Sequence, residues 1–216
     1  MSLQASNPCR TQQAGFALLE VLVTLVILLF GLLGLAGVSS RANLAEMESY
    51  QRVQALQLLQ DMSDRLSANR GVAISVVPYN GIALCYSNGS TGVTLGTGST
   101  SIPSCTSTTA PSSTVLQRVQ AVADLTAWDA MLKGSAESLT GSGSKVGAMI
   151  GAVGCITQDD AANNVYLIAV SWQGLAPTYA PTLANGTTPF PCGNGLYGNE
   201  KLHRVVTTKV QIGKLS

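Results

Sequence analysis

The chain has 216 residues with 12 basic and 11 acidic side chains, so its formal net charge is only +1. This balance excludes the basic surplus through which proteins bind nucleic acid. Charged residues make up only 11% of the chain and its mean hydropathy is +0.28. Such values indicate a very apolar segment joined to a polar, uncharged body. The chain has one histidine, His203, which excludes a metal site built from several histidines.

The apolar segment lies close to the N-terminus. Residues 1–15 are polar with one charge at Arg10, and the apolar run from Phe16 to Val38 follows, interrupted by a single charge at Glu20. As a helix this run would be roughly 34 Å long, enough to cross a bilayer core of about 30 Å. It is longer than the apolar core of a cleaved secretory signal, about 7–15 residues. A signal cleaved near residues 36–40 is the alternative.

The position of Glu20 is unusual, because a carboxylate within an apolar helix needs either a partner or access to water. Gly15, Phe16 and Glu20, followed by an uninterrupted apolar stretch, resemble the class III signal of type IV prepilins. The resemblance implies that prepilin peptidase cuts between Gly15 and Phe16 and that Phe16 is then N-methylated. It also implies that Glu20 acts in filament assembly. Ala17 stands where many members of that family have threonine, and no proline interrupts the apolar run.

Physical chemistry supports a role for this spacing. Cleavage after Gly15 would free an amine at Phe16, and Glu20 would lie one helical turn further on the same face. In a filament of staggered parallel helices, the amine of one subunit can meet the carboxylate of its neighbour. An unpaired carboxylate in such an apolar core is penalised, so the pair would fix the register between subunits.

The helix is expected to continue to about Asn69, with an amphipathic second half and a stop at Asn69-Arg70-Gly71. We therefore predict a leader peptide at 1–15, a transmembrane or filament-core helix at 16–40, an amphipathic continuation at 41–70 and a periplasmic globular head at 71–216. The predicted inner face of the amphipathic part consists of apolar residues at helical spacing: Leu44, Met47, Leu56, Leu59, Met62 and Leu66.

The end of this helix, from Ala55 to Arg70, is similar to the corresponding part of PilV-type minor pilins, in which an Asp-Arg-apolar-x-x-Asn-Arg ending is common. The resemblance implies a minor pilin in the tip or priming complex of the filament, where it supports pilus assembly and adhesin presentation. Implied partners are prepilin peptidase, other minor pilins, the major pilin and a PilY-type tip adhesin. The implied location is the inner membrane before assembly and the pilus afterwards. Alternatives are a type II secretion pseudopilin and a signal-anchored periplasmic enzyme or binding domain.

Five cysteines are present, of which Cys9 lies in the expected leader. The other four are widely spaced in surroundings rich in Gly, Pro, Ser and Thr, which is typical of two disulfides in an oxidising compartment. Three pairings are possible. We favour Cys85–Cys105, which closes a local loop, together with Cys155–Cys192, which ties two later segments. Reduced, buried thiols are the alternative.

The expected fold class is α+β, with the long N-terminal helix packed on an antiparallel sheet, as in type IV pilins. Residues 71–114 are expected to form loops and a short hairpin. A second helix should run from a cap at Ser112-Ser113-Thr114 to about Lys133, with Trp128 in the core. Strands are predicted at 146–157, 164–172 and 203–212.

Several patterns that suggest chemistry have a simpler explanation. Residues 193–198 spell G-x-G-x-x-G but lack the preceding strand and following helix of a dinucleotide site. No G-x-S-x-G elbow accompanies the serines and His203, which we place at a strand end on the surface. Asp159-Asp160 with Asn163-Asn164 indicates a turn rather than a calcium loop. We therefore expect no enzyme activity, catalytic residue, metal or cofactor.

Overall fold

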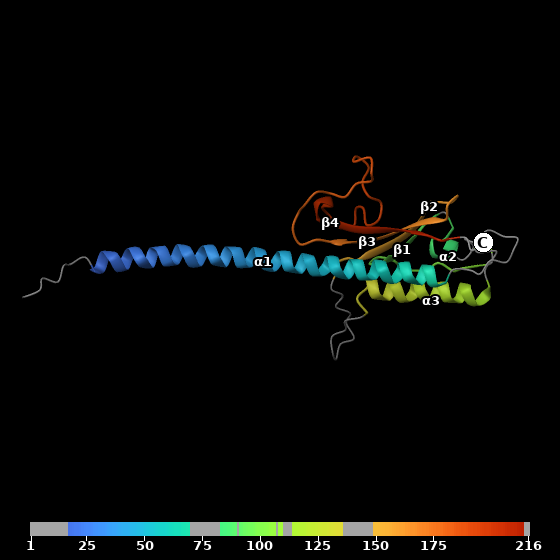
Figure 1. The fold of residues 1–216 in the computed structure, drawn as a ribbon, viewed down its shortest axis with the longest axis horizontal. Helices are drawn as coiled ribbons and strands as arrows, with labels where there is room; N and C mark the ends of the chain where they lie inside the picture. Colours follow the sequence, from blue (N-terminus) through green and yellow to red (C-terminus); the bar gives the residue numbers. More distant parts are fainter. Residues whose placement is uncertain are drawn as a thin grey trace, which may run out of the picture. The chain divides into compact units, whose positions relative to one another are not determined.

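The computed structural model describes residues 17–69, 83–89, 91–106, 108–109, 114–135 and 149–213. By its internal contacts the chain divides into an N-terminal unit, Met1–Ala45, and a C-terminal unit, Glu46–Ser216. The division falls within the first helix. In chain order the elements are α1 (Ala17–Ala68), α2 (Ala83–Tyr86), β1 (Val93–Gly96), α3 (Val115–Leu132), β2 (Val153–Asp160), β3 (Val165–Gln173), the 3-10 helix η1 (Glu200–Leu202) and β4 (His203–Gln211) (Figure 1).

The four strands form one antiparallel sheet in the order β1-β2-β3-β4. β3 has no exposed residue, as its content of β-branched and aromatic residues predicts. Ile156 is paired with Ile168, and Val170 with Val206, so branched side chains face one another across neighbouring strands. The antiparallel sheet expected from the sequence is confirmed.

The core lies between one face of this sheet and two helices, the second half of α1 and α3, which run side by side (Figure 1). α3 begins where the sequence predicts, because the Thr114 hydroxyl accepts from the backbone N–H of Gln117 while the Gln117 side chain accepts from that of Thr114. The principal buried side chains come from all three parts: Ala55, Leu59, Met62, Leu66, Leu125, Trp128, Ile156, Ile168 and Val170. The predicted packing of a long helix on a sheet is confirmed.

Only half of the predicted inner face of α1 is buried. Leu59, Met62 and Leu66 belong to the core, whereas Leu44, Met47 and Leu56 are 45%, 56% and 46% exposed. At about 100° per residue, Leu56 and Met47 lie roughly 80–100° away from the centre of the buried row. Leu44 is exposed for another reason, because it precedes Glu46, where the C-terminal unit begins. The inner row continues toward the N-terminus through Ala55 and Gln51, at steps of four.

Three further sequence predictions need correction. The strand predicted at 146–157 instead runs from Val153 to Asp160, because a turn with Gly151 at φ +62° precedes it. Within the tract expected to form loops, Val93–Gly96 is strand β1, which pairs with β2 rather than with a hairpin partner of its own. The short helix α2 lies in the same tract. Both elements have only four residues, which is too few to show a period.

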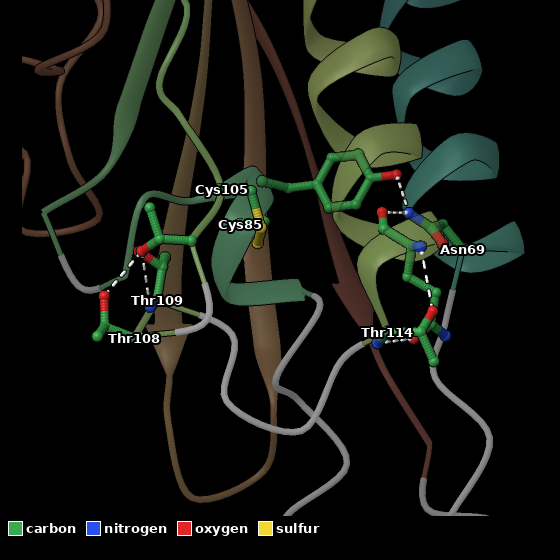
Figure 2. Close-up of a disulfide and its surroundings, with 9 residues drawn as sticks. Asn69, Cys85, Cys105, Thr108, Thr109 and Thr114 are labelled. Carbon is green, nitrogen blue, oxygen red and sulfur yellow. Dashed lines mark hydrogen bonds between the residues drawn. A yellow bond between two sulfur atoms is a disulfide. The ribbon is translucent and has the colours of Figure 1, made fainter.

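Two disulfides join Cys85 to Cys105 and Cys155 to Cys192, the two pairings that the sequence favours. The first ties α2 to the segment that follows β1 (Figure 2). The second ties β2 to the long loop between β3 and β4. That loop covers the other face of the sheet, where a second, smaller apolar cluster consists of Val153, Cys155, Ala169, Phe190 and Cys192.

Trp128 fixes the distance between α3 and the sheet. Its ring lies directly over Gly154 in β2, so closely that a Cβ at this position would overlap the indole. Its Nε1 donates a hydrogen bond of 2.9 Å to the carbonyl oxygen of Leu58 in α1. One buried side chain therefore joins both helices to the sheet, and it requires glycine beneath it.

We predict that Gly154→Ala destabilises the C-terminal unit by about 1–3 kcal/mol, since the new methyl group forces Trp128 and Leu132 out of place. Thermal unfolding of the full-length protein in detergent, followed by tryptophan fluorescence, measures the loss. Gly213→Ala is the matched control, because a Cβ at Gly213 meets no heavy atom within 4 Å. Equal melting temperatures for the two variants would contradict the packing described here.

Candidate assembly segment

The first part of α1 exposes an almost continuous apolar surface. Its large side chains between Leu18 and Val38 are all at least 40% exposed. By length and composition this helix is apolar enough to cross a membrane. A soluble monomer rarely exposes so much contiguous apolar surface, so this segment is built for lipid or for other helices.

Glu20 lies in the first turn of α1 and its side chain is exposed. The positive end of the helix dipole favours a carboxylate at this place. Nearby, the Thr24 hydroxyl donates to the carbonyl oxygen of Val21 at 2.9 Å, so it has a partner within the helix. The predicted cleavage site, Gly15 and Phe16, lies outside the described residues.

At the start of the C-terminal unit, Glu48 ties α1 to the far end of the sheet. Its Oε1 accepts from the backbone N–H groups of Leu175 and Ala176 and from Nη2 of Arg204, each at 3.1 Å. The Arg204 guanidinium lies against Gly174, where any Cβ would collide with it. This carboxylate therefore holds α1, the turn after β3 and the start of β4 together. No sequence motif revealed it, because its partners lie 127 to 156 residues away along the chain.

At the other end of the buried row, the residues behind the PilV resemblance make a second polar cluster. Arg65 pairs with Asp61 at 2.7 Å and with Asp124 of α3 at 3.1 Å. The Tyr86 hydroxyl donates to the other oxygen of Asp124 and accepts from the Asn69 side chain at 3.0 Å. The sequence allowed these charges to be merely solvated, whereas Arg65 and Asn69 bind α1 to α2 and α3.

These contacts shift two ionisation equilibria. The hydrogen bond from Arg65 to Asp61 is the largest influence that raises the pKa of Arg65. Burial raises the pKa of Tyr86 far above its ordinary value, and the hydrogen bond to Asp124 adds to the effect. Tyr86 therefore keeps its proton, and stays a donor to Asp124, near pH 10, where an exposed tyrosine ionises.

His203 is not at the surface, contrary to the sequence-based expectation. It is only 1% exposed, and its Nδ1 lies 3.0 Å from Oε2 of Glu200, with the ring of Tyr197 tilted against it. The turn through Gly195 folds over the start of β4 and covers it. The backbone N–H of Gly195 and then His203 lower the pKa of Glu200. Tyr197 in turn hydrogen-bonds Ser171 at 2.9 Å.

Asp159 and Asp160 lie at the end of β2, where the sequence predicted a turn. Asp159 pairs with Lys209 of β4, and Asp160 accepts from the backbone N–H groups of Ala162 and Asn163. Across the described ranges no three His, Cys, Asp or Glu side chains gather as a metal site would require.

The chain matches the family model for the prokaryotic N-terminal methylation motif over residues 10–36. This span contains the Gly15–Phe16 junction, Glu20 and most of the exposed apolar run. This match supports a type IV pilin-like prepilin. No curated protein and no solved structure matches it.

The motif defines the class of protein to which the chain belongs. It supports a pilin or pseudopilin that prepilin peptidase processes, and it implies assembly with other pilins. The apolar helix fits a subunit that is anchored in the inner membrane and later joins the pilus. The motif ends at residue 36 and therefore does not extend into the C-terminal unit.

Buried tyrosines predict how stability depends on pH. Burial raises the pKa of Tyr166 and of Tyr197 to about 12, from an ordinary value of 10.0. Between these values the unfolded chain releases the two protons while the folded chain keeps them, so stability must fall as pH rises above about 10. We predict a declining melting temperature in this range and a shallower decline, by about one proton, for Tyr197→Phe.

Tyr179→Phe is the control for loss of a phenolic hydroxyl, because the side chain of Tyr179 is 88% exposed. The measured quantity is the slope of stability against pH. Loss of the hydrogen bond between Tyr197 and Ser171 lowers stability but does not change this slope, which reports proton release. An undiminished slope in Tyr197→Phe would contradict the prediction.

Proposed function

We propose that this chain is a minor pilin of a type IV pilus, of the PilV type, which is processed between Gly15 and Phe16 and enters the filament. The observation that carries the proposal is the methylation motif at residues 10–36, with Glu20 in the first turn of an exposed apolar helix. Under this proposal residues 1–15 are the leader and 16–40 the filament-core helix. Residues 41–70 continue the helix, and 71–216 form a periplasmic head.

The proposed assembly step is electrostatic. Processing frees the amine of Phe16. In the apolar core of the filament, this charged amine forms an ion pair with the Glu20 carboxylate of a neighbouring subunit. Removal of water strengthens the attraction between the two charges but also penalises either charge alone. Misaligned subunits would bury an unpaired charge, so the pair selects one register.

Two features support a filament subunit on the outer side of the inner membrane. Both disulfides suit an oxidising compartment such as the bacterial periplasm. Removal of residues 1–15 deletes Arg10 and leaves 11 basic and 11 acidic side chains, so net repulsion does not oppose packing between subunits.

The more specific assignment rests on the end of α1. Arg65 and Asn69, which carry the PilV resemblance, hold α1 against α2 and α3, so this ending serves a particular packing arrangement. By that resemblance we propose a place in the tip or priming complex, with other minor pilins, the major pilin and a PilY-type adhesin as partners.

We predict that Gly15→Ala blocks processing, because the peptidase cuts after a glycine in this family. N-terminal mass spectrometry of the membrane-held protein should find methylated Phe16 in the wild type and an intact leader in the variant. Gly31→Ala is the matched control, since a Cβ at Gly31 meets no heavy atom within 4 Å. A wild-type chain that begins at Met1, or near Ala36, would exclude the proposal.

We predict that Glu20→Gln lowers the amount of this chain in sheared pili by about tenfold, the effect of about 1.4 kcal/mol, since the amine of the neighbour loses its counter-charge. Quantitative mass spectrometry of sheared pili and of membranes measures the ratio. Glu46→Gln, an exposed position on the same helix, is the control.

Two outcomes would contradict this proposal in different ways. Normal incorporation of Glu20→Gln would remove the electrostatic mechanism. Absence of the processed wild-type chain from sheared pili would exclude the minor pilin and leave the pseudopilin.

A further inference from the structure

α3 is apolar on two opposite sides. Its inner side is buried in the core through Leu125, Trp128 and two further apolar residues, Ala121 and Leu132. Its outer side carries Leu116 and Val119, which are 81% and 61% exposed, and continues at helical spacing through uncharged residues, Ala123, Thr126 and Ala130. We call the row Leu116, Val119, Ala123, Thr126 and Ala130 the outer face of α3.

The charged residues of α3 do not lie on this outer face. Asp124 is buried against Arg65 and Tyr86. Asp129 accepts from the backbone N–H of Gly96 at 2.8 Å and from Lys133 at 2.7 Å. Arg118 is half-buried. A helix at a protein surface normally places charged side chains on its outer side, so an outer side without charges suits contact with another apolar surface.

We propose that the outer face of α3 docks onto an uncharged, apolar surface of a neighbouring pilin-type subunit, which is itself held by an apolar N-terminal helix. The inference rests on the proposed function and goes beyond it, because it assigns an interface to the C-terminal unit. The absence of charged side chains on the outer face of α3 indicates which kind of partner surface fits it. Polar or charged groups placed on this face would lose water and gain no partner in exchange, so an uncharged surface fits it.

The size of the face decides how the partner is held. An 18-residue helix is about 27 Å long and presents a strip about 10 Å wide, so it buries about 300 Å². A stable complex between free proteins needs about 800 Å² on each partner. The face is therefore too small to hold a soluble partner alone. It suffices for a neighbour that is already concentrated beside it in the same membrane or filament.

A photo-reactive amino acid in place of Val119, in the full-length chain in living cells, tests the contact. We expect a covalent adduct with a protein whose peptides include a prepilin-type N-terminal helix, a second copy of this chain included. Thr207, an exposed residue on the opposite face of the sheet, carries the probe in the control. No adduct at Val119, or an adduct only with proteins that lack such a helix, would overturn the inference.

A double variant, Leu116→Glu with Val119→Glu, tests the same contact through filaments. Both side chains are exposed, so the melting temperature and the cleavage after Gly15 should be unchanged. Incorporation into sheared pili should fall by about tenfold or more, because the docked face would bury unpaired charges. Thr207→Glu is the matched control. Normal incorporation of a folded, processed double variant would overturn the inference.

The two proposals fail separately in these experiments. Processing is measured from the N-terminus of the same protein, so an uncleaved wild-type chain contradicts the proposed function whatever Val119 contacts. A cleaved chain without the Val119 adduct contradicts only the docking face.

Discussion

The C-terminal unit depends on how the second half of α1 is held. A row of apolar side chains at steps of three and four, Ala55, Leu59, Met62 and Leu66, forms one wall of the core. A polar cluster lies at each end of this row. Glu48 binds the turn after β3 and Arg204 at one end, while Arg65 binds Asp124 of α3 at the other. Apolar burial supplies most of the free energy, and the two polar clusters fix the helix along its own axis.

This arrangement separates two tasks along one helix. The contacts that fold the C-terminal unit begin near Glu48, whereas the exposed apolar side chains that suit lipid or other helices occur mainly before Val38. Changes in the first part therefore leave the core intact. Residues such as Glu20 are therefore constrained by contacts with neighbouring subunits, whereas residues such as Leu59 are constrained by packing in the core.

The sequence predicted the parts whose signal is local. The apolar run that begins at Phe16, the cap at Thr114 and the β-branched content of β3 placed α1, α3 and that strand correctly. Both disulfides have the pairing that the sequence analysis favoured. There, one bridge was expected to close a local loop and the other to tie two later segments.

The parts that were missed depend on contacts between distant residues. β1 has four residues and exists because it pairs with β2, about sixty residues later in the chain. His203 is buried by the turn through Gly195, which no pattern in its own strand reveals. Glu48 looked like any charge on an amphipathic helix, and only the fold brings Arg204 to it. In the candidate site, the role that the motif implies for Glu20 stays a prediction. The uncharged row of α3 follows a helical spacing that the sequence contains, but only the structure shows that Leu116 and Val119 are exposed.

Under the proposed function the protein meets extracellular proteases, and the bridge between Cys155 and Cys192 then has a consequence. The loop it closes exposes Tyr179 and a polar hairpin around Gly186, sites that extracellular proteases readily reach. A single cut there would leave two fragments still joined through sulfur, with β4 still paired to β3. A nicked subunit would thus keep its shape, and the fibre that contains it would not break at that point.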